Sequence, residues 1–290
     1  MTPKQVKNML TRLERADAVT SLGLVRRLDP VEPVRFAPQF REALHSPSGL
    51  VRQLACKKLR YANDLEVARP LTEVLENDPD ESVRRSAAAA LGGFSSPAVV
   101  AALLKAARSD PAPEVRRFAM FSLRELKVIE AALPLAERLG VDGTIGEKEP
   151  GVVQAILDVI GELADPRVVP ILARYYDRTE DPGALAPLGK IGSEEAARFL
   201  QGILQQKRPR FIQEQIATSL LRLENGRYDA FLVQQAQTNR EPAVRAAVYR
   251  AAQEAELPPE RRRPFATAAG ASLAQDQAPE VREAAAGLLK

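Results

Sequence analysis

One short phrase recurs along this chain at nearly constant spacing. Each copy carries an anchor valine followed by an alanine-rich stretch, and the first three anchors are Val51, Val83 and Val115. They lie 83−51 = 32 and 115−83 = 32 residues apart. Weaker or later copies have their anchors at Val152, Val244 and Val281. A fixed period of this length predicts stacked supersecondary units in place of a single globular core.

The apolar residues within each copy follow the period of an α-helix. In the second copy, apolar or small residues fall at the anchor and three, four, seven and eight residues after it, at Val83, Ser86, Ala87, Ala90 and Leu91. A second apolar segment precedes each copy, and a turn such as Asp110-Pro111 joins the two. Since this spacing places apolar residues on one helix face, and proline favours the first turn of a helix, each unit is expected to be helix, turn, helix.

The pattern predicts an all-α solenoid that runs through residues 1–290 as a single domain. Residues 1–30 would form capping helices and residues 31–290 the repeats. Irregularities are expected near 140–150, near 180–192 because Pro187 interrupts a helix, and at 257–265, where three prolines surround three arginines. The nine expected helical pairs are 4–14 with 17–28, 34–45 with 49–61, 65–77 with 81–93, 97–109 with 113–126, 129–139 with 150–163, 166–178 with 182–191, 193–206 with 209–224, 227–238 with 241–255, and 260–275 with 279–289.

Residue types that usually carry catalysis or bind metals are scarce. His45 is the only histidine and Cys56 the only cysteine, which excludes an intrachain disulfide and zinc sites built from several such residues. Neither GxxxxGK[ST] nor GxGxxG occurs, and no nucleophile elbow lies near His45. We therefore expect no catalytic residue, no metal and no cofactor.

The chain also lacks the apolar segments of a secreted or membrane protein. Its N-terminal residues contain no continuous apolar stretch of the kind a signal peptide needs. No window approaches the ~20 apolar residues of a membrane span. The sequence therefore predicts a cytoplasmic protein with no membrane partner.

Charge is distributed unevenly around a net value of +3. Residues 1–60 carry 12 Lys and Arg against 5 Asp and Glu, a net of +7, whereas residues 146–200 carry 6 against 10, a net of −4. Such asymmetry can steer an anionic partner to one end of the chain. Terminal repeats also need polar outer faces to remain in solution, which explains the same charges without a ligand.

The order Asp-Pro, a few residues, Val-Arg and an alanine-rich helix resembles the HEAT-like repeat, in the short bacterial form also seen in phycobilin lyases. The resemblance is strongest at 80–92, 112–124, 241–252 and 278–289. It implies a right-handed α-solenoid of about nine helical pairs. In that family the arginine after the valine usually supports packing between repeats, often against an acidic turn residue. It thus implies a structural role for Arg52, Arg84, Arg116, Arg245 and Arg282. Val153 replaces this arginine in the fourth copy.

A second basic set lies two, six and nine residues after the anchors, at the helix positions farthest from the apolar stripe. The resemblance implies that the second helix of each pair lines a concave face. We therefore predict a binding stripe for protein or nucleic acid, with an exposed aromatic residue, formed by Lys57, Arg60, Arg85, Arg117, Phe121 and Arg124. An ordinary solvated face is the alternative. The fourth copy holds Gln154, Asp158 and Gly161 at these positions, so the stripe would end there.

These observations favour a non-catalytic scaffold that binds a protein partner on its concave face. The alternative is binding of DNA or RNA by the same basic stripe, although the acidic middle disfavours a long duplex. A resemblance to HEAT-like DNA glycosylases would imply an aspartate flanked by aromatic residues, prominently tryptophan. The chain has no tryptophan, and Asp158, its candidate acid, lies in the acidic middle. The HEAT-repeat hydroxylase needs several His-Glu pairs, which one histidine cannot supply. The oligomeric state remains open.

Overall fold

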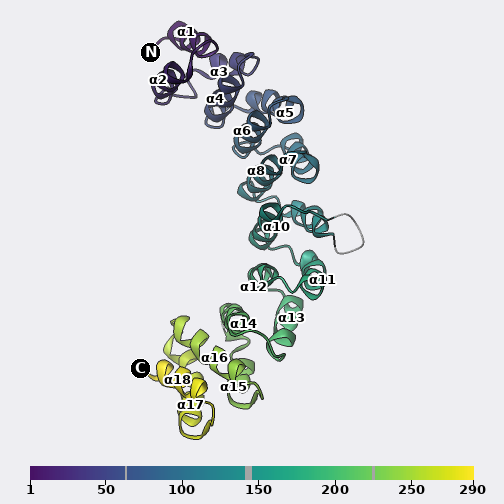
Figure 1. Cartoon of the computed structure of the whole chain (residues 1–290), viewed down its shortest axis with the longest axis vertical. Helices are drawn as coiled ribbons and strands as arrows, with labels where there is room; N and C mark the ends of the chain where they lie inside the picture. The colour runs from purple at the N-terminus through teal and green to yellow at the C-terminus, as the bar shows by residue number, and fades with distance from the viewer. Residues whose placement is uncertain (63, 141–145, 224–225) are drawn as a thin grey trace. The chain divides into compact units, whose positions relative to one another are not determined.

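The computed structural model describes residues 1–290 apart from 63, 141–145 and 224–225, and the described residues form helices without any strand (Figure 1). The first nine α-helices are α1 (Pro3–Leu13), α2 (Ala18–Leu28), α3 (Ala37–Ala43), α4 (Gly49–Leu59), α5 (Ala68–Asn77), α6 (Glu81–Leu91), α7 (Pro97–Ser109), α8 (Pro113–Glu125) and α9 (Ala132–Ala136). The next nine are α10 (Pro150–Leu163), α11 (Val169–Thr179), α12 (Leu185–Ile191), α13 (Glu194–Leu204), α14 (Arg210–Arg222), α15 (Asp229–Thr238), α16 (Pro242–Glu254), α17 (Pro259–Gln275) and α18 (Pro279–Leu289).

These helices fall into two compact units. The first contains residues 1–140 and 146–159, the second contains the described residues from 160 to 290, and the boundary lies within α10. In the first unit the second helices α4, α6 and α8 pack against one another in a row, and α5 packs against α7 on the other side (Figure 1). In the second unit α14, α16 and α18 form an equivalent row.

The helix α6 shows why the repeated phrase folds in this way. Asp80 precedes the helix, and its side chain accepts a hydrogen bond from the Ser82 N–H at 2.8 Å, as an N-cap residue does. The stripe residues Val83, Ala87 and Leu91 are all 0% exposed. Burial of a leucine or valine side chain stabilises the fold by about 1.5–3 kcal/mol. Packing of the apolar stripe therefore holds each helix in its layer.

The nine helical pairs predicted from the sequence are confirmed, with differences at their ends. The second helix of the sixth pair shortens to α12, which a 3-10 turn at Pro182–Ala184 precedes. Pro187 falls in the first turn of α12, where a missing N–H costs no α-helical hydrogen bond. Part of the irregular stretch expected near 140–150 lies outside the described residues. No described helix is both long and apolar enough to cross a membrane.

The segment 257–265, expected to be irregular, is helical from Pro259 onward, in agreement with the helix expected at 260–275. The helix α17 begins at Pro259 and continues through Pro264. Two arginines of its first turns anchor it: Arg261 holds the Asp229 carboxylate through two 2.8 Å hydrogen bonds, and Arg262 donates to the Leu288 carbonyl at 2.7 Å. The prolines of this segment favour a break in the helix, and these tertiary hydrogen bonds keep the segment helical.

Candidate functional site

The six residues predicted to bind a partner lie on three neighbouring second helices of the first unit. Lys57 lies on α4 and Arg60 directly follows it, Arg85 lies on α6, and the other three residues lie on α8. Because α4 packs on α6 and α6 on α8, the fold brings these residues to one series of helices. Their binding role remains a prediction.

Three of the six residues, all arginines, lie around a pair of phenylalanines, and a fourth, Phe121, is one of that pair. The Arg85 guanidinium lies over the Phe118 ring, 5.7 Å from its centroid. Arg117 and Arg124 lie 5.9 and 5.3 Å from the centroid of Phe121. The two rings meet edge to face, with their centroids 6.1 Å apart. We call Arg85, Arg117, Phe118, Phe121 and Arg124 the cation–aromatic cluster. Contacts of this geometry are attractive because the ring face carries negative charge.

Phe121 differs from the exposed residue that the sequence suggested. It is half-buried, and so is Phe118, which lies three residues after the anchor Val115, at a position of the apolar stripe. A large ring at the edge of that stripe reaches the helix surface, so that both rings support guanidinium groups. Phe118 is therefore a part of the cluster that helical periodicity did not identify.

Among the described residues, some of the predicted cations are paired with carboxylates of the same unit, and others are not. Arg60 is engaged within the fold: its guanidinium donates to the Ala89 carbonyl and to both oxygens of Glu125, at 2.5 and 2.6 Å. Arg117 pairs with Glu114 at 2.7 Å. Throughout the described part of the chain, no carboxylate lies within ion-pair distance of Lys57, Arg85 or Arg124. Those three cations are available to a ligand.

The position nine residues after the anchor faces solvent at Arg124, as the helical pattern suggested, but not in every copy. Gly92 is buried, and a Cβ there would lie 2.9 Å from the hydroxyl oxygen of Ser122 on α8. Gly161 is buried too, and its Cβ would lie 2.9 Å from the Cα of Pro187. In these two copies the neighbouring second helix lies against the glycine, whereas Arg60 donates to the Ala89 carbonyl of the next helix.

The five arginines assigned a structural role share one arrangement. The Nη1 group of each arginine donates a hydrogen bond to the backbone carbonyl of the residue six positions earlier, at 2.7–3.0 Å. Arg52, Arg84 and Arg245 also hold both oxygens of an aspartate in the next turn, at 2.7–3.0 Å. Those aspartates are Asp78, Asp110 and Asp276, with side chains no more than 9% exposed. The pKa of each of these three arginines is raised by the hydrogen bond to its aspartate.

Each of these aspartates serves two arginines. The side chain of Asp78 accepts a hydrogen bond from Arg52, and its backbone carbonyl accepts one from Arg84. Asp110 joins Arg84 to Arg116 in the same way. We call each such connection an arginine link. The sequence signal for the acceptor is an aspartate six residues before the next arginine, a feature that the analysis of anchors alone did not use.

The third link takes a different acceptor. Arg116 meets Glu147, with Nη2 3.0 Å from one carboxylate oxygen, and Arg138 reaches the other oxygen at 3.1 Å. Burial pushes the pKa of Glu147 upward, but hydrogen bonds from the Glu149 N–H and from both arginines outweigh it and lower the pKa overall. Glu147 thus replaces the aspartate where the spacing between copies increases.

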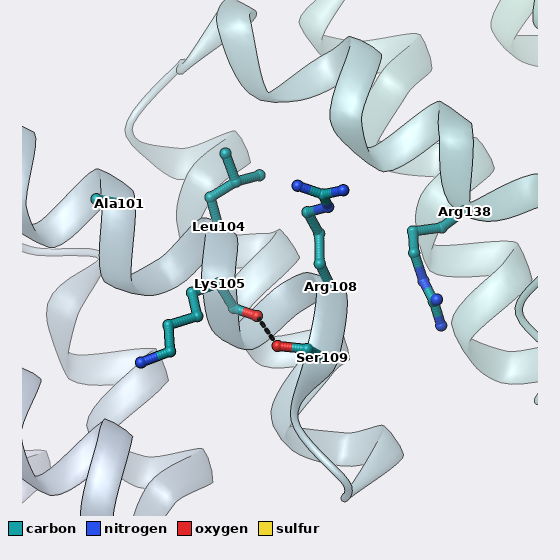
Figure 2. A pocket seen from close by; sticks show the side chains of 6 residues that line it. All are labelled: Ala101, Leu104, Lys105, Arg108, Ser109 and Arg138. Atoms are coloured by element: carbon teal, nitrogen blue, oxygen red, sulfur yellow. Dashed lines mark hydrogen bonds between the residues drawn. The ribbon is translucent and has the colours of Figure 1, made fainter.

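A groove of about 500 Å³ lies on the first-helix side of the first unit, bordered by Leu104, Lys105, Arg108 and Arg138 (Figure 2). The Lys105 and Arg108 side chains leave α7 in different directions, and Arg138 points away from both (Figure 2). Lys105 pairs with Glu76 at 2.9 Å and Arg138 with Glu147. The cations do not converge on a common point, so this groove is a weaker candidate for an anion than the cation–aromatic cluster.

Groups suited to metal binding do not gather among the described residues. No set of three or more His, Cys, Asp or Glu residues there has metal-binding geometry. Cys56 is 0% exposed, and burial raises its pKa to about 12, so its thiol stays protonated.

Comparison with known proteins agrees with the repeat pattern. Residues 37–124 match the family described as HEAT repeats, which confirms the HEAT-like resemblance. No curated protein matches the chain. Similar solved structures include the CpcE–CpcF complex of phycocyanin lyase from Nostoc sp. PCC7120, at 19% identity, a TM-score of 0.45, and coverage of 89% of this chain and 95% of that one.

Two further structures are similar at comparable identity. Human deoxyhypusine hydroxylase in complex with glycerol has 19% identity and a TM-score of 0.37, with 99% of this chain and 95% of that one covered. YibA of Escherichia coli has 17% identity and a TM-score of 0.49, with 94% and 98% covered. Likeness at this level does not transfer an activity.

Proposed function

We propose that this chain is a non-catalytic scaffold whose first unit binds a protein partner through its second-helix face. The observation that carries the proposal is the cation–aromatic cluster, where Arg85 and Arg124 lie over phenylalanine rings and have no carboxylate partner among the described residues. Arginine and aromatic residues are enriched at the centres of protein interfaces. HEAT-like repeats expose long surfaces, and binding is the usual use of such surfaces.

The distribution of charge favours a protein over a nucleic acid. A nucleic-acid strand needs cations along its whole track, because each neutralised phosphate contributes to affinity. On this face Glu114 and Glu125 lie among the cations, and α10 presents Gln154 and Asp158, which hydrogen-bond each other at 2.9 Å. The basic residues therefore form a bounded patch rather than a track.

Affinity enrichment from cells of the source organism tests the proposal. The wild-type chain is compared with an Arg85→Glu/Arg124→Glu variant and with an Arg108→Glu/Arg263→Glu control. The control makes the same change in net charge at two exposed arginines outside the cluster, for which the described part of the chain contains no ion-pair partner. We expect one protein to be retained by the wild type and the control and lost by the cluster variant, and then to form a purified complex. Equal retention by all three would exclude this face.

Binding of a short DNA duplex and of single-stranded DNA, measured over a range of salt concentrations, separates the alternative function. We expect no binding even at low salt. Tight binding that weakens steeply with salt, and that the cluster variant abolishes, would assign the face to nucleic acid instead.

A further inference from the structure

The cation–aromatic cluster also indicates the chemistry of the segment that it receives. An arginine can lie over a ring face and still donate hydrogen bonds from its planar guanidinium. The guanidinium groups of Arg85 and Arg124 lie 5.7 Å from the Phe118 centroid and 5.3 Å from the Phe121 centroid, respectively. Each carries a planar fork of donors, the arrangement that pairs with both oxygens of one carboxylate.

The same chain shows what such forks bind when they are filled. Arg52, Arg84 and Arg245 each hold an aspartate through Nε and Nη2, with all six distances between 2.7 and 3.0 Å. In the cluster, Arg117 has Glu114 as its partner, whereas the described residues offer none to Arg85 or Arg124. Two open forks thus lie on neighbouring helices of one unit.

Spacing and polarity define the complementary segment more closely. Packed helices lie about 8–10 Å apart, and Arg124 lies seven residues beyond Arg117, the counterpart of Arg85, which adds about 10 Å along the helix axis. The two positions are therefore about 14 Å apart. An extended peptide rises about 3.3 Å per residue, so carboxylates four residues apart span a similar length, and the side chain midway between them lies on the same face. The half-buried ring of Phe121 provides apolar surface beside Arg124. An apolar side chain between the two acids would cover it.

We propose that the cation–aromatic cluster binds an extended acidic segment of the protein partner, with one carboxylate on Arg85, a second on Arg124 and an apolar side chain against Phe121. This inference rests on the proposed function, because it assigns the partner's chemistry to the same face. Phosphate groups of a nucleic acid are the competing ligand, and the experiment includes them.

Fluorescence anisotropy with defined probes tests this assignment. The probes are a short labelled peptide in which glutamates four residues apart flank leucine and phenylalanine, the same peptide with glutamine in place of glutamate, and a single-stranded oligothymidylate. We expect the glutamate peptide to bind at least tenfold more tightly than either other probe. Preference for the oligothymidylate, or equal binding of the two peptides, would overturn the proposal.

Variants then test the forks themselves. Arg85→Gln and Arg124→Gln should each weaken binding of the glutamate peptide by about tenfold, as expected for loss of one charge-assisted pair. Arg124→Lys keeps the charge but not the fork, and should weaken binding several-fold. Arg108→Gln is the matched control, and its affinity should equal that of the wild type. If the lysine variant binds as tightly as the wild type, or if the control loses as much affinity as the cluster variants, the forks are not the site.

The peptide and enrichment experiments fail in distinguishable ways. A cellular partner that depends on Arg85 and Arg124, together with no binding of the glutamate peptide, would support the scaffold function and refute the acidic segment. Specific binding of the glutamate peptide, without any cellular protein that depends on the face, would support the chemistry of the cluster and refute the scaffold function.

Discussion

The guanidinium of Arg84 holds the two carboxylate oxygens of Asp110 at 2.9 and 3.0 Å, across 110−84 = 26 residues of chain. Both side chains are largely removed from solvent, with 12% and 7% of their surfaces exposed. Arg84 also donates to the Asp78 carbonyl at 3.0 Å. One side chain thereby fixes its own turn and joins it to the next turn along the unit.

Replacement of Arg84 by alanine should lower the free energy of unfolding by about 1–3 kcal/mol. The variant leaves the buried Asp110 carboxylate without its bidentate partner, and an unsatisfied buried group costs energy of this order. Urea denaturation followed by circular dichroism measures the effect. Arg108→Ala removes an exposed arginine of α7 and should change the free energy by no more than about 0.5 kcal/mol. Equal losses in the two variants would show that the link does not stabilise the fold.

The link between Arg245 and Asp276 should make stability depend on pH under acidic conditions. The hydrogen bond from Arg245 holds the pKa of Asp276 below its ordinary value of 3.8 in the folded protein. A carboxylate of lowered pKa stabilises the fold fully above its unfolded pKa, and this contribution is lost as pH falls through the folded value. Stability from this pair should therefore be present at neutral pH and decline below about pH 4.

Asp276→Asn isolates that contribution from other carboxylates. We expect the variant to be less stable than the wild type at neutral pH by about 1–3 kcal/mol, and the difference to shrink below about pH 4 as the wild-type carboxylate is protonated. Urea denaturation of both proteins over this range of pH provides the comparison. A difference that stays constant with pH would contradict an ionic link at this position.

Two glycines should respond in opposite directions to alanine. At Gly92 a Cβ would lie 2.9 Å from the Ser122 hydroxyl oxygen, which itself donates to the Ala88 carbonyl at 2.8 Å. Gly92→Ala should therefore destabilise the first unit by about 1–3 kcal/mol through overpacking. At Gly270, inside α17, no atom lies within 4 Å of the added Cβ, and Gly270→Ala should stabilise by about 0.4–1 kcal/mol. Thermal denaturation distinguishes these signs, and a stabilising Gly92→Ala would refute close packing there.

Gln213 marks a place where the arginine links are interrupted. It follows Ile212 on α14 as Arg52 follows Val51 on α4, and it is 0% exposed. Neither polar atom of its side-chain amide has a hydrogen-bond partner within the residues that the structure describes. Gln213→Met removes this polar group with little change in volume and should raise the free energy of unfolding by about 1 kcal/mol. The partly exposed Gln215 serves as the control, since Gln215→Met should have little effect. A loss of stability in Gln213→Met would indicate that the amide is satisfied in solution.

The repeat pattern predicted the fold well because helix periodicity and burial express the same physical requirement. Val83, Val115 and Val244 were identified as anchors, and each is 0% exposed. Local helix propensity was less informative where tertiary hydrogen bonds determine the secondary structure. In α17, such bonds from Arg261 and Arg262 hold a proline-rich segment in a helix.

The candidate site was only partly accessible from sequence for a similar reason. Periodicity assigns a residue to a helix face, but it does not show how closely the next helix approaches or which charges pair. The sequence placed Arg60 and Arg85 on the same helix face. In the structure, however, Arg60 donates hydrogen bonds to Glu125 and to the Ala89 carbonyl. Phe118 joined the cluster only once the position of Arg85 on α6 was known relative to α8.

The double role of Asp78 and Asp110 bears on how the chain length of the first unit can change. Arg52 and Arg84 lie 84−52 = 32 residues apart, as do the two aspartates, 110−78 = 32. A segment of that length copied in tandem therefore brings one donor arginine and one acceptor aspartate with it. The new junction would regain a complete link, whereas a segment whose length is not a multiple of 32 residues would leave an arginine opposite the wrong residue. Within α4–α8 the links thus make whole-repeat duplication or deletion the tolerated form of insertion and loss.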